Sequence, residues 1–414
     1  MKKMDAYRIH LIRSALDSLG ASLIWTAMMT YQVQVVGLTP LQLVLVGTTM
    51  ETAVFLFEIP TGIVADVYSR RLSCIIGFFI LGIAYLVQGA YPAFAVLLLG
   101  NVLWGVGYTF TSGAYSAWLV DEIGQDRAGN AFIRGGQVGQ LAGLVGIVLS
   151  MILGVIHLQL PIVFGAIITG SIAVIMLVFM PETGFTPVPA QDRTTFQKMW
   201  DTFRAGVGVI RSRPRLMSIL AVGIFFGLFS EGWDRLWEAH LITTFNVQAA
   251  IGIPQVVIRG ILNLSLLALS VTALEVLRRR IDTNNLARLT SVVFLLTAVM
   301  VGAVIGYGIA PSLIAAIGLW YAFNIARALI EPLLATWTNG HVDSNVRATV
   351  LSMQSQVDAI GQMVGGPPVG LIGQTSLRAA FVASGLILSP ALFLLQRVRR
   401  REAADAVAAP AAAP

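Results

Sequence analysis

Long apolar runs follow one another along the whole chain, separated by short breaks that contain proline, glycine or charged residues. A helix that crosses a bilayer needs roughly 20 predominantly apolar residues. Twelve runs meet this requirement, at approximately 10–36, 41–65, 71–90, 93–120, 129–155, 159–180, 215–243, 253–276, 287–307, 311–338, 347–373 and 377–397. The pattern predicts an all-α membrane protein with twelve transmembrane helices.

The composition supports an exterior that faces lipid. Hydrophobic residues make up 56% of the 414 positions and charged residues only 12%, whereas soluble domains carry about 25% charged residues. The single cysteine, Cys74, excludes an internal disulfide, and the four histidines are scattered without metal-binding spacing. Neither a metal nor another cofactor is expected.

The basic residues favour one side of the membrane. All but four of the 27 Lys and Arg residues fall in the N-terminus, the C-terminus, the central loop or the breaks that follow even-numbered runs. The exceptions are Arg235, Arg259, Arg327 and Arg378. Cytoplasmic loops are enriched in Lys and Arg, so both termini are predicted to be cytoplasmic, in a cell (inner) membrane. This distribution accounts for the net charge of +6 without a nucleic-acid partner.

A loop at 181–214 divides the chain into two halves with six runs each. This layout predicts two pseudo-symmetric six-helix bundles, over 1–180 and 215–400. Within the loop, apolar residues recur at spacings of three and four over 196–210, which fits an interfacial amphipathic helix or a helix that covers a bundle. The Ala- and Pro-rich segment 401–414 is expected to be disordered.

The two halves share a few positions. Arg127 and Gly146 of the first half are separated by the same distance in sequence as Arg347 and Gly366 of the second half. Each arginine begins a glycine-bearing run, the fifth and the eleventh. The layout and these pairs together indicate an internal duplication.

The break between the second and third runs carries a specific signature. The chain reads Gly62-Ile63-Val64-Ala65-Asp66-Val67-Tyr68-Ser69-Arg70-Arg71 there, preceded by Glu58-Ile59-Pro60-Thr61. This segment resembles the helix 2–3 loop signature of the major facilitator superfamily, extended in the manner of several drug-efflux branches. The resemblance implies a drug:proton antiporter-like transporter that works by alternating access, with a substrate site between its halves.

The same loop predicts a gating latch formed by Gly62, Asp66, Arg70, Arg71 and Asp121. Asp66 ends the second helix, where its carboxylate can accept hydrogen bonds from a neighbouring helix N-terminus. Arg70 and Arg71 can bind carboxylates such as Asp121 or Glu122 at the end of the fourth helix. Such contacts would close the cytoplasmic side; the alternative is a polar loop that only follows the positive-inside pattern.

Two features differ from the antiporter pattern. The antiporter-type fourth helix usually carries an arginine ahead of Gly-x-Gly, where this chain has Asn101 ahead of Gly105 and Gly107. The fifth helix lacks the Gly-Pro pair of the antiporters, although its glycines still allow close helix contact. Proton coupling and export direction therefore stay open at this point.

Charged residues at membrane depth are costly and indicate function. Three carboxylates are candidate proton carriers: Asp17 in the first helix, Glu51 in the second and Glu331 in the tenth. Glu331 is expected to be buried, where the protonated form is favoured unless a cation such as Arg327 lies nearby. Breaking an Arg327–Glu331 contact could thus make Glu331 take up a proton, although this pair could also only fix packing. Asp358 in the eleventh helix is a further charge without an assigned role.

The outer end of the seventh helix holds a cluster of charges: Glu231, Asp234, Arg235 and Glu238. The three carboxylates share one face of the predicted helix, with the arginine adjacent to each of them. The cluster suggests an outer gate or a cation vestibule, or else a structural network of ion pairs.

Two helix faces are candidates for the substrate cavity, because the resemblance implies that helices 1, 4, 7 and 10 line it. The tenth helix presents Trp320, Asn324, Arg327 and Glu331 at spacings of four, three and four. The first and fourth helices contribute a mostly aromatic set: Trp25, Tyr31, Asn101, Trp104 and Tyr108. An aromatic, mildly polar wall suits lipophilic compounds, although aromatic stripes also serve packing.

The expected function is secondary active transport, with proton-coupled efflux of lipophilic or amphipathic compounds. The partners would be a small-molecule substrate, protons and the lipid bilayer, with the protein acting as a monomer. One alternative is uptake or export of a polar or anionic metabolite or a lipid, with Arg327 binding an anion. An intramembrane enzyme or receptor is a further alternative, against which the sequence shows neither a nucleophile with its base nor an ATP-binding loop.

Overall fold

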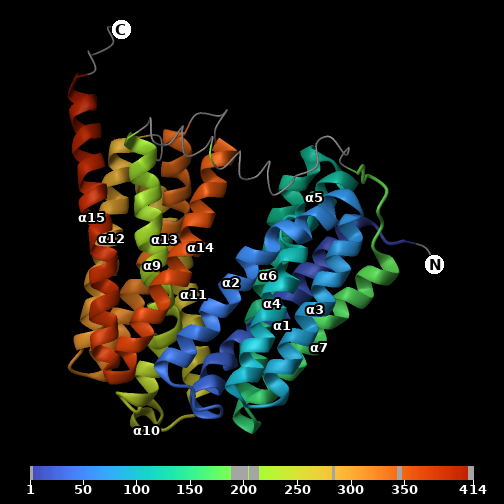
Figure 1. The fold of residues 1–414 in the computed structure, drawn as a ribbon, viewed down its shortest axis with the longest axis horizontal. Helices are drawn as coiled ribbons and strands as arrows, with labels where there is room; N and C mark the ends of the chain where they lie inside the picture. Colours follow the sequence, from blue (N-terminus) through green and yellow to red (C-terminus); the bar gives the residue numbers. More distant parts are fainter. Residues whose placement is uncertain (1–2, 188–203, 205–213, 282–284, 343–346, 409–414) are drawn as a thin grey trace. The chain divides into compact units, whose positions relative to one another are not determined.

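The computed structural model of the chain describes residues 3–187, 204, 214–281, 285–342 and 347–408, which are drawn as ribbons in Figure 1. Throughout these ranges the regular structure is helical. The chain divides into two compact units. Unit 1 comprises Met1–Phe196 and Val247–Leu264, and unit 2 comprises Gln197–Asn246 and Ser265–Pro414.

Unit 1 is a bundle of long helices. Its elements are α1 (Ala6–Gln34), α2 (Pro40–Val67), α3 (Arg70–Ala90), α4 (Phe94–Thr111), α5 (Ala114–Ile123), α6 (Gln125–Ile156), α7 (Gln159–Phe179), α10 (Val247–Ile251) and the start of α11 (Gln255–Arg280). Polar caps set several helix starts: Thr39 and Gln42 form a capping box around Pro40 at the first turn of α2. α1 packs against α6 and α7, and α3 packs against α4 and α7.

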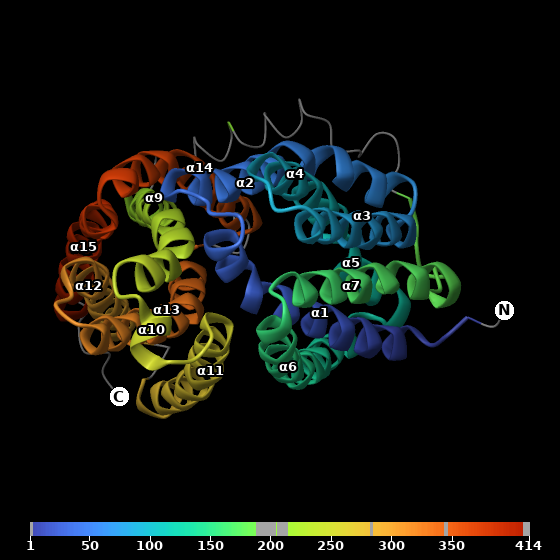
Figure 2. The same ribbon diagram turned by 90° about the horizontal axis from the view of Figure 1, so that it is seen from below.

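Unit 2 is a second helical bundle around an aromatic core. Its elements are α9 (Pro214–Thr243), the end of α11, α12 (Leu286–Ile309), α13 (Leu313–His341), α14 (Arg347–Thr375) and α15 (Leu377–Ala408). α9 packs against α14 and α15, and α12 lies against α13 and α15, as Figure 2 shows for α12 and α15. The Trp233 ring of α9 is fully buried and contacts the rings of Phe323, Tyr307 and Phe381. These contacts tie α9 to α12, α13 and α15.

A helix is present at each of the twelve predicted positions, and ten segments of the described chain are long and apolar enough to cross a membrane. α1 and α14 are 29 residues long but do not reach this apolar threshold. Both carry charges within the apolar run, Arg13 and Asp17 in α1 and Asp358 in α14. These two helices, which combine membrane length with charges inside the apolar run, are thus candidates for positions next to a polar site.

The predicted fourth helix, 93–120, matches one candidate membrane span, Phe94–Ile123, but this span contains a break. α4 ends at Thr111 and α5 begins at Ala114, with Gly113 between them at φ 72°. Glycine adopts this left-handed conformation at little cost because it has no Cβ, so the chain can turn between two helical segments. The three small residues Thr111, Ser112 and Gly113 interrupt the apolar run only briefly, which is why the hydropathy pattern predicts one helix.

Glycines bring pairs of helices into backbone contact in both units. In unit 1, an added Cβ at Gly146 of α6 would lie 2.6 Å from the carbonyl oxygen of Leu19 in α1. In unit 2, a Cβ at Gly365 of α14 would lie 2.0 Å from the carbonyl oxygen of Leu228 in α9. The predicted close contact of the fifth helix is confirmed, and the eleventh helix makes the corresponding contact in the second half.

Two predictions concern the ends of the second half. The amphipathic helix predicted over 196–210 lies outside the described residues except for position 204. The tail predicted to be disordered from residue 401 is helical up to Ala408, so that prediction is wrong for 401–408. Alanine has the highest helix propensity, and the Ala-rich sequence therefore extends α15; residues 409–414 lie outside the described part.

Candidate functional site

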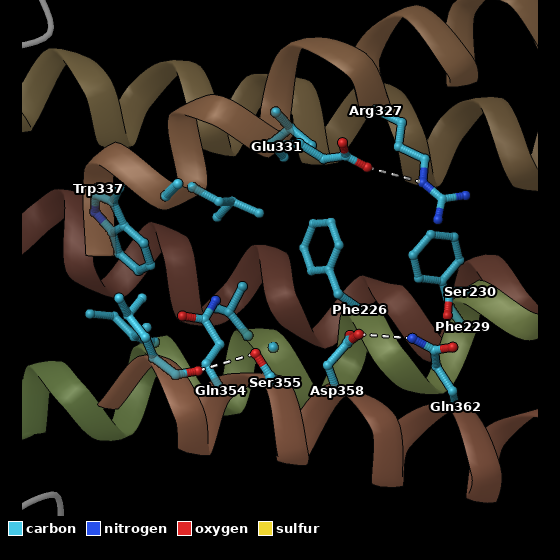
Figure 3. A pocket seen from close by; sticks show the side chains of 17 residues that line it. Phe226, Phe229, Ser230, Arg327, Glu331, Trp337, Gln354, Ser355, Asp358 and Gln362 are labelled. Atoms are coloured by element: carbon cyan, nitrogen blue, oxygen red, sulfur yellow. Dashed lines mark hydrogen bonds and ion pairs between the residues drawn. The ribbon is translucent and has the colours of Figure 1, made fainter. Parts of the chain in front are cut away.

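A cavity of about 410 Å³ opens within unit 2 among α9, α13 and α14. Figure 3 shows Arg327 and Glu331 of α13 on one wall and Asp358 and Gln362 of α14 on the opposite wall, with phenylalanine rings of α9 between them. Three charged side chains thus share one space inside a bundle of membrane-length helices. A cavity of this volume is within the range of roughly 300–1,000 Å³ that small-molecule sites occupy.

Arg327 pairs more closely with Asp234 of α9 than with Glu331, its neighbour on α13. Its two terminal nitrogens donate to the two carboxylate oxygens of Asp234 at 2.5 and 3.1 Å. The Glu331 carboxylate is 3.8 Å from the Arg327 Nε, and the Glu331 side chain is 71% exposed. The predicted Arg327–Glu331 contact is therefore present, but the expectation that Glu331 is buried is wrong. Asp234 is the closer partner because its two oxygens match the parallel N–H groups of the guanidinium.

The α14 wall carries a stripe of polar side chains. Gln354, Ser355, Asp358 and Gln362 line the cavity at helical spacing. The Gln362 Nε2 donates to the Asp358 carboxylate at 2.8 Å. Sequence reasoning noted Asp358 as a charge at membrane depth but missed its place in the site; the signal was the spacing of four between polar residues over 354, 358 and 362.

Aromatic side chains complete the cavity. The rings of Phe226 and Phe229 from α9 and of Trp337 from α13 line it. The Trp337 Nε1 donates to the Thr290 hydroxyl at 2.8 Å, which satisfies the one polar atom of this buried ring. The cavity therefore combines a polar stripe with apolar surface, as sites for amphipathic ligands do.

The charges of the seventh predicted helix separate into different environments. Glu231 and Arg235 are buried and form an ion pair at 3.2 Å along α9, and Glu238 is fully buried. Asp234 instead crosses to Arg327 of α13. The helix 7 cluster and the helix 10 face, which the sequence treats as two sites, are thus joined through one ion pair.

Two predicted cavity residues of α13 lie in packing contacts. Trp320 is 2% exposed and packs against the Trp237 ring at 5.0 Å. Asn324 donates its amide N–H to the carbonyl oxygen of Trp320 at 2.8 Å. Neither belongs to the lining of the cavity described above, so only Arg327 and Glu331 of the four predicted residues do.

Unit 1 brings three of the predicted aromatic residues together. The rings of Trp104 and Tyr108 stack at 5.1 Å, and the Trp25 ring lies edge-on to Trp104 at 6.3 Å. The Trp104 Nε1 donates to the Tyr85 hydroxyl at 2.6 Å, which fixes the orientation of its ring. Trp25 and Tyr108 are 37% and 42% exposed, so this group forms an accessible aromatic surface.

The other predicted residues of unit 1 have structural contacts. Tyr31 is fully buried and donates to the carbonyl oxygen of Gln88, and the buried Asn101 donates to the side-chain oxygen of the same Gln88. Asp17 pairs with Arg13 at 2.8 Å along α1, and Glu51 is half-buried in α2. Tyr31 and Asn101 therefore serve packing rather than a cavity.

The predicted latch is present in part. Arg70 forms an ion pair with Asp121 of α5, as the sequence predicts. Arg71 donates to the carbonyl oxygen of Leu177 at 2.6 Å. Within the described residues the Asp66 side chain makes no hydrogen bond or ion pair, and a Cβ at Gly62 would meet no atom of another element within 4 Å. Neither residue therefore contributes the contact expected of it.

Glu182 occupies the place predicted for Asp66. Its carboxylate accepts from the Ser69 hydroxyl at 2.7 Å and from the Arg71 backbone N–H at 2.9 Å, at the start of α3. Glu122 of α5 accepts from the Thr183 hydroxyl at 2.8 Å. The segment after α7 is thus bound to both α3 and α5, a connection across about 110 residues that local spacing could not reveal.

Membrane-length helices that hold charged residues around a cavity are features typical of a multi-pass membrane transporter. The sequence model of the major facilitator superfamily matches residues 11–366, and the chain therefore belongs to this superfamily. It is a membrane transporter rather than an enzyme. The resemblance to the superfamily is confirmed, and the drug:proton branch stays a prediction.

Individual relatives agree with this assignment. The uncharacterized MFS-type transporter YxaM of Bacillus subtilis (strain 168) is 24% identical over 364 residues, which cover 86% of this chain and 85% of the relative. A solved mutant of the nucleoside transporter NupG has a TM-score of 0.74 at 15% identity, over 95% of this chain and 99% of that chain. The human organic anion transporter MFSD10 (TETRAN) has a TM-score of 0.60 at 17% identity, over 94% and 99% of the two chains. These likenesses show the fold.

Proposed function

We propose that this transporter exports lipophilic or amphipathic compounds in exchange for protons, by alternating access of a twelve-helix bundle. In this proposal it resides in the cell (inner) membrane as a monomer with both termini in the cytoplasm. The observation that carries the proposal is the cavity of unit 2, where carboxylates outnumber cations beside aromatic side chains.

The charges of the cavity support the exchange of a substrate for protons. Of the lining residues that the structure describes, Arg327 is the one cation, and Asp234 accepts from both of its terminal nitrogens. Glu331 thus lies 3.8 Å from a cation that is already paired, and Asp358 forms no ion pair within the described residues. A negative charge inside a membrane protein is costly unless a proton or a cation neutralises it. If a proton and a substrate neutralise these carboxylates in turn, the proton and the substrate cross the membrane in opposite directions.

The apolar surfaces support lipophilic or amphipathic substrates. Phe226 offers a partly exposed ring beside the polar stripe of unit 2, and the buried rings of Phe229 and Trp337 lie behind the cavity wall. The accessible group of Trp25, Trp104 and Tyr108 offers another aromatic surface in unit 1. Aromatic side chains contact ligands mainly through apolar surface rather than through directed hydrogen bonds. Such contacts tolerate ligands of varied structure. Export rather than uptake rests on the segment Glu58–Thr61, which resembles drug-efflux branches.

The alternative is transport of a polar or anionic metabolite, with Arg327 as the anion site. Structural neighbours include proteins described as a nucleoside transporter, an organic anion transporter and peptide transporters. An anion would have to displace Asp234 from Arg327 and would also meet Glu331 and Asp358. Like charges at short range oppose such binding, so the export of neutral or cationic amphipathic compounds is the favoured proposal.

Reconstitution tests the proposal. Proteoliposomes with purified protein would be screened for transport of amphipathic compounds with and without a pH gradient. We expect the gradient to drive transport, and Glu331→Gln, which fixes the neutral form at that position, to impair the response to the gradient. Equal transport rates of the wild-type protein with and without the pH gradient would refute proton coupling.

A further inference from the structure

The backbone of Asp358 is fixed at the cavity wall. A Cβ at Gly227 of α9 would lie 2.3 Å from the Asp358 carbonyl oxygen, so the two helices are in backbone contact at this residue. One turn further along α14, a Cβ at Gly361 would lie 2.9 Å from the Leu228 backbone nitrogen. Because glycines on both helices permit this contact, Asp358 is held at one position relative to α9.

The carboxylate of Asp358 has spare acceptor capacity and no cation of its own. It accepts one hydrogen bond, from the Gln362 side-chain N–H, at 2.8 Å from one of its two oxygens. Among the described side chains, no Lys, Arg or His nitrogen lies within 4.0 Å of it. A carboxylate offers about four lone-pair sites, so most of them remain available to a ligand.

The charged groups around Asp358 leave a negative balance. In the part of the chain that the structure describes, Arg327 of α13 attracts the negative charge of Asp358 and Asp234 of α9 repels it. They are paired with each other, so their fields largely cancel, and Glu331 adds a further negative charge to the same cavity. α15 also packs against α14 and adds no titratable group near Asp358 in the part of the chain that the structure describes.

The chemistry of the surrounding wall selects a ligand. The partly exposed ring of Phe226 lines the cavity with Asp358, and ring faces attract cations that carry apolar groups. Ser355, one turn from Asp358, adds a hydroxyl. The combination suits an ammonium, phosphonium or similar positive group with apolar substituents, and it disfavours anions.

From this arrangement we infer that Asp358 binds the positively charged group of the substrate, so that the unit 2 cavity takes amphipathic organic cations. The inference rests on the proposed transport function and narrows its substrate class. A proton and the cation compete for the same carboxylate, so cation binding weakens as the pH falls.

Two ions of matched size and opposite charge test the inference by equilibrium binding to the purified protein: tetraphenylphosphonium and tetraphenylborate. The wild-type protein should bind the cation more tightly than the anion. Asp358→Asn keeps the size and the acceptor for Gln362 but removes the charge, and it should weaken cation binding by about tenfold or more, as loss of a charge-assisted contact does. The pH dependence of cation binding should disappear in this variant. Asp358→Glu should restore part of the cation affinity and part of its pH dependence.

Glu275→Gln is the matched control. Glu275 pairs with Arg278 and Arg279 at the exposed end of α11 and does not line the cavity, so cation affinity should equal that of the wild type. Thermal unfolding of each variant separates loss of binding from loss of fold. Wild-type affinity and pH dependence in a folded Asp358→Asn protein would overturn the assignment of this residue, and a wild-type protein that prefers the anion or binds neither ion would overturn the cation class.

The binding test is independent of transport. If cation binding depends on Asp358 but a pH gradient drives no flux in proteoliposomes, the proposed function fails while the binding site stands. If the gradient drives flux of amphipathic compounds and Asp358→Asn binds the cation as the wild type does, the proposed function stands and the inference fails.

Discussion

Removal of the Asp234 charge should destabilise unit 2, because Arg327 would lose its closest partner. The pair joins α9 to α13 through two hydrogen bonds of 2.5 and 3.1 Å. Breaking a fully buried ion pair costs about 3–5 kcal/mol. The Arg327 and Asp234 side chains are 32% and 39% exposed, and Glu331 at 3.8 Å can replace part of the interaction. For Asp234→Asn we therefore expect a smaller loss of unfolding free energy, about 1–2 kcal/mol.

Thermal unfolding of the detergent-solubilised protein, followed by tryptophan fluorescence, measures this loss. At roughly 2–4 °C per kcal/mol for a domain of this size, Asp234→Asn should lower the midpoint by about 2–8 °C. Arg327→Gln should lower it as well, and the double variant should lose less than the sum of the two, because the two residues interact directly. Glu275→Gln, at an exposed pair, should leave the midpoint unchanged. Additive effects of Asp234→Asn and Arg327→Gln would refute the energetic coupling of α9 and α13 through this pair.

Three further predictions concern packing, gating and topology. Gly365→Ala should cost about 1–3 kcal/mol of unfolding free energy because its Cβ would lie 2.0 Å from a backbone oxygen of α9. The control, Gly302→Ala, introduces a Cβ with no atom within 4 Å and should be neutral or stabilising. Equal thermal midpoints for the two variants would contradict the close contact. Asp121→Asn, which removes the ion-pair partner of Arg70, should slow transport at unchanged substrate affinity; a wild-type transport rate at normal expression would argue against the latch. A cysteine placed at Gln191 in a Cys74→Ser protein should resist impermeant thiol reagents in intact cells; ready labelling would reverse the orientation.

The positions of the helices were predictable because lipid imposes a long apolar run on each membrane-spanning segment. The break between α4 and α5 was not, since three small residues, Thr111, Ser112 and Gly113, inside a long apolar run are also compatible with a continuous helix. The backbone conformation of Gly113 distinguishes the two cases. The end of α15 was missed for a related reason. Alanine is compatible both with a disordered tail and with a helix, and composition alone does not decide between them.

Partners along one helix were predictable from spacing, and partners on different helices were not. Spacing identified Glu331 as a neighbour of Arg327, but the closer partner, Asp234, is 93 residues away. The same limit applies to the caps of α3, where Glu182 rather than Asp66 meets the helix start. Conversely, the ion pair of Arg70 with Asp121 was predictable, because it rests on a loop signature that resembles the superfamily.

Polar and aromatic residues inside apolar runs proved to be of two kinds. Tyr31 and Asn101 satisfy their hydrogen bonds on Gln88 within the packed interior. Arg327 and Asp358 instead line an open cavity. The sequence offers no way to separate these cases, since both place a polar group at membrane depth and differ only in whether a neighbouring helix fills the space beside it.

Exchange of an organic cation for protons is the central claim, and flux in proteoliposomes tests it most directly. Liposomes with an acidic interior, purified protein and a clamped membrane potential would be given ethidium, a fluorescent cation, on the outside. We predict that ethidium enters faster than in protein-free liposomes, that the interior becomes more alkaline as it does so, and that Asp358→Asn abolishes both changes. Ethidium entry at the same rate with and without the pH gradient, or entry without alkalinisation, would contradict the account.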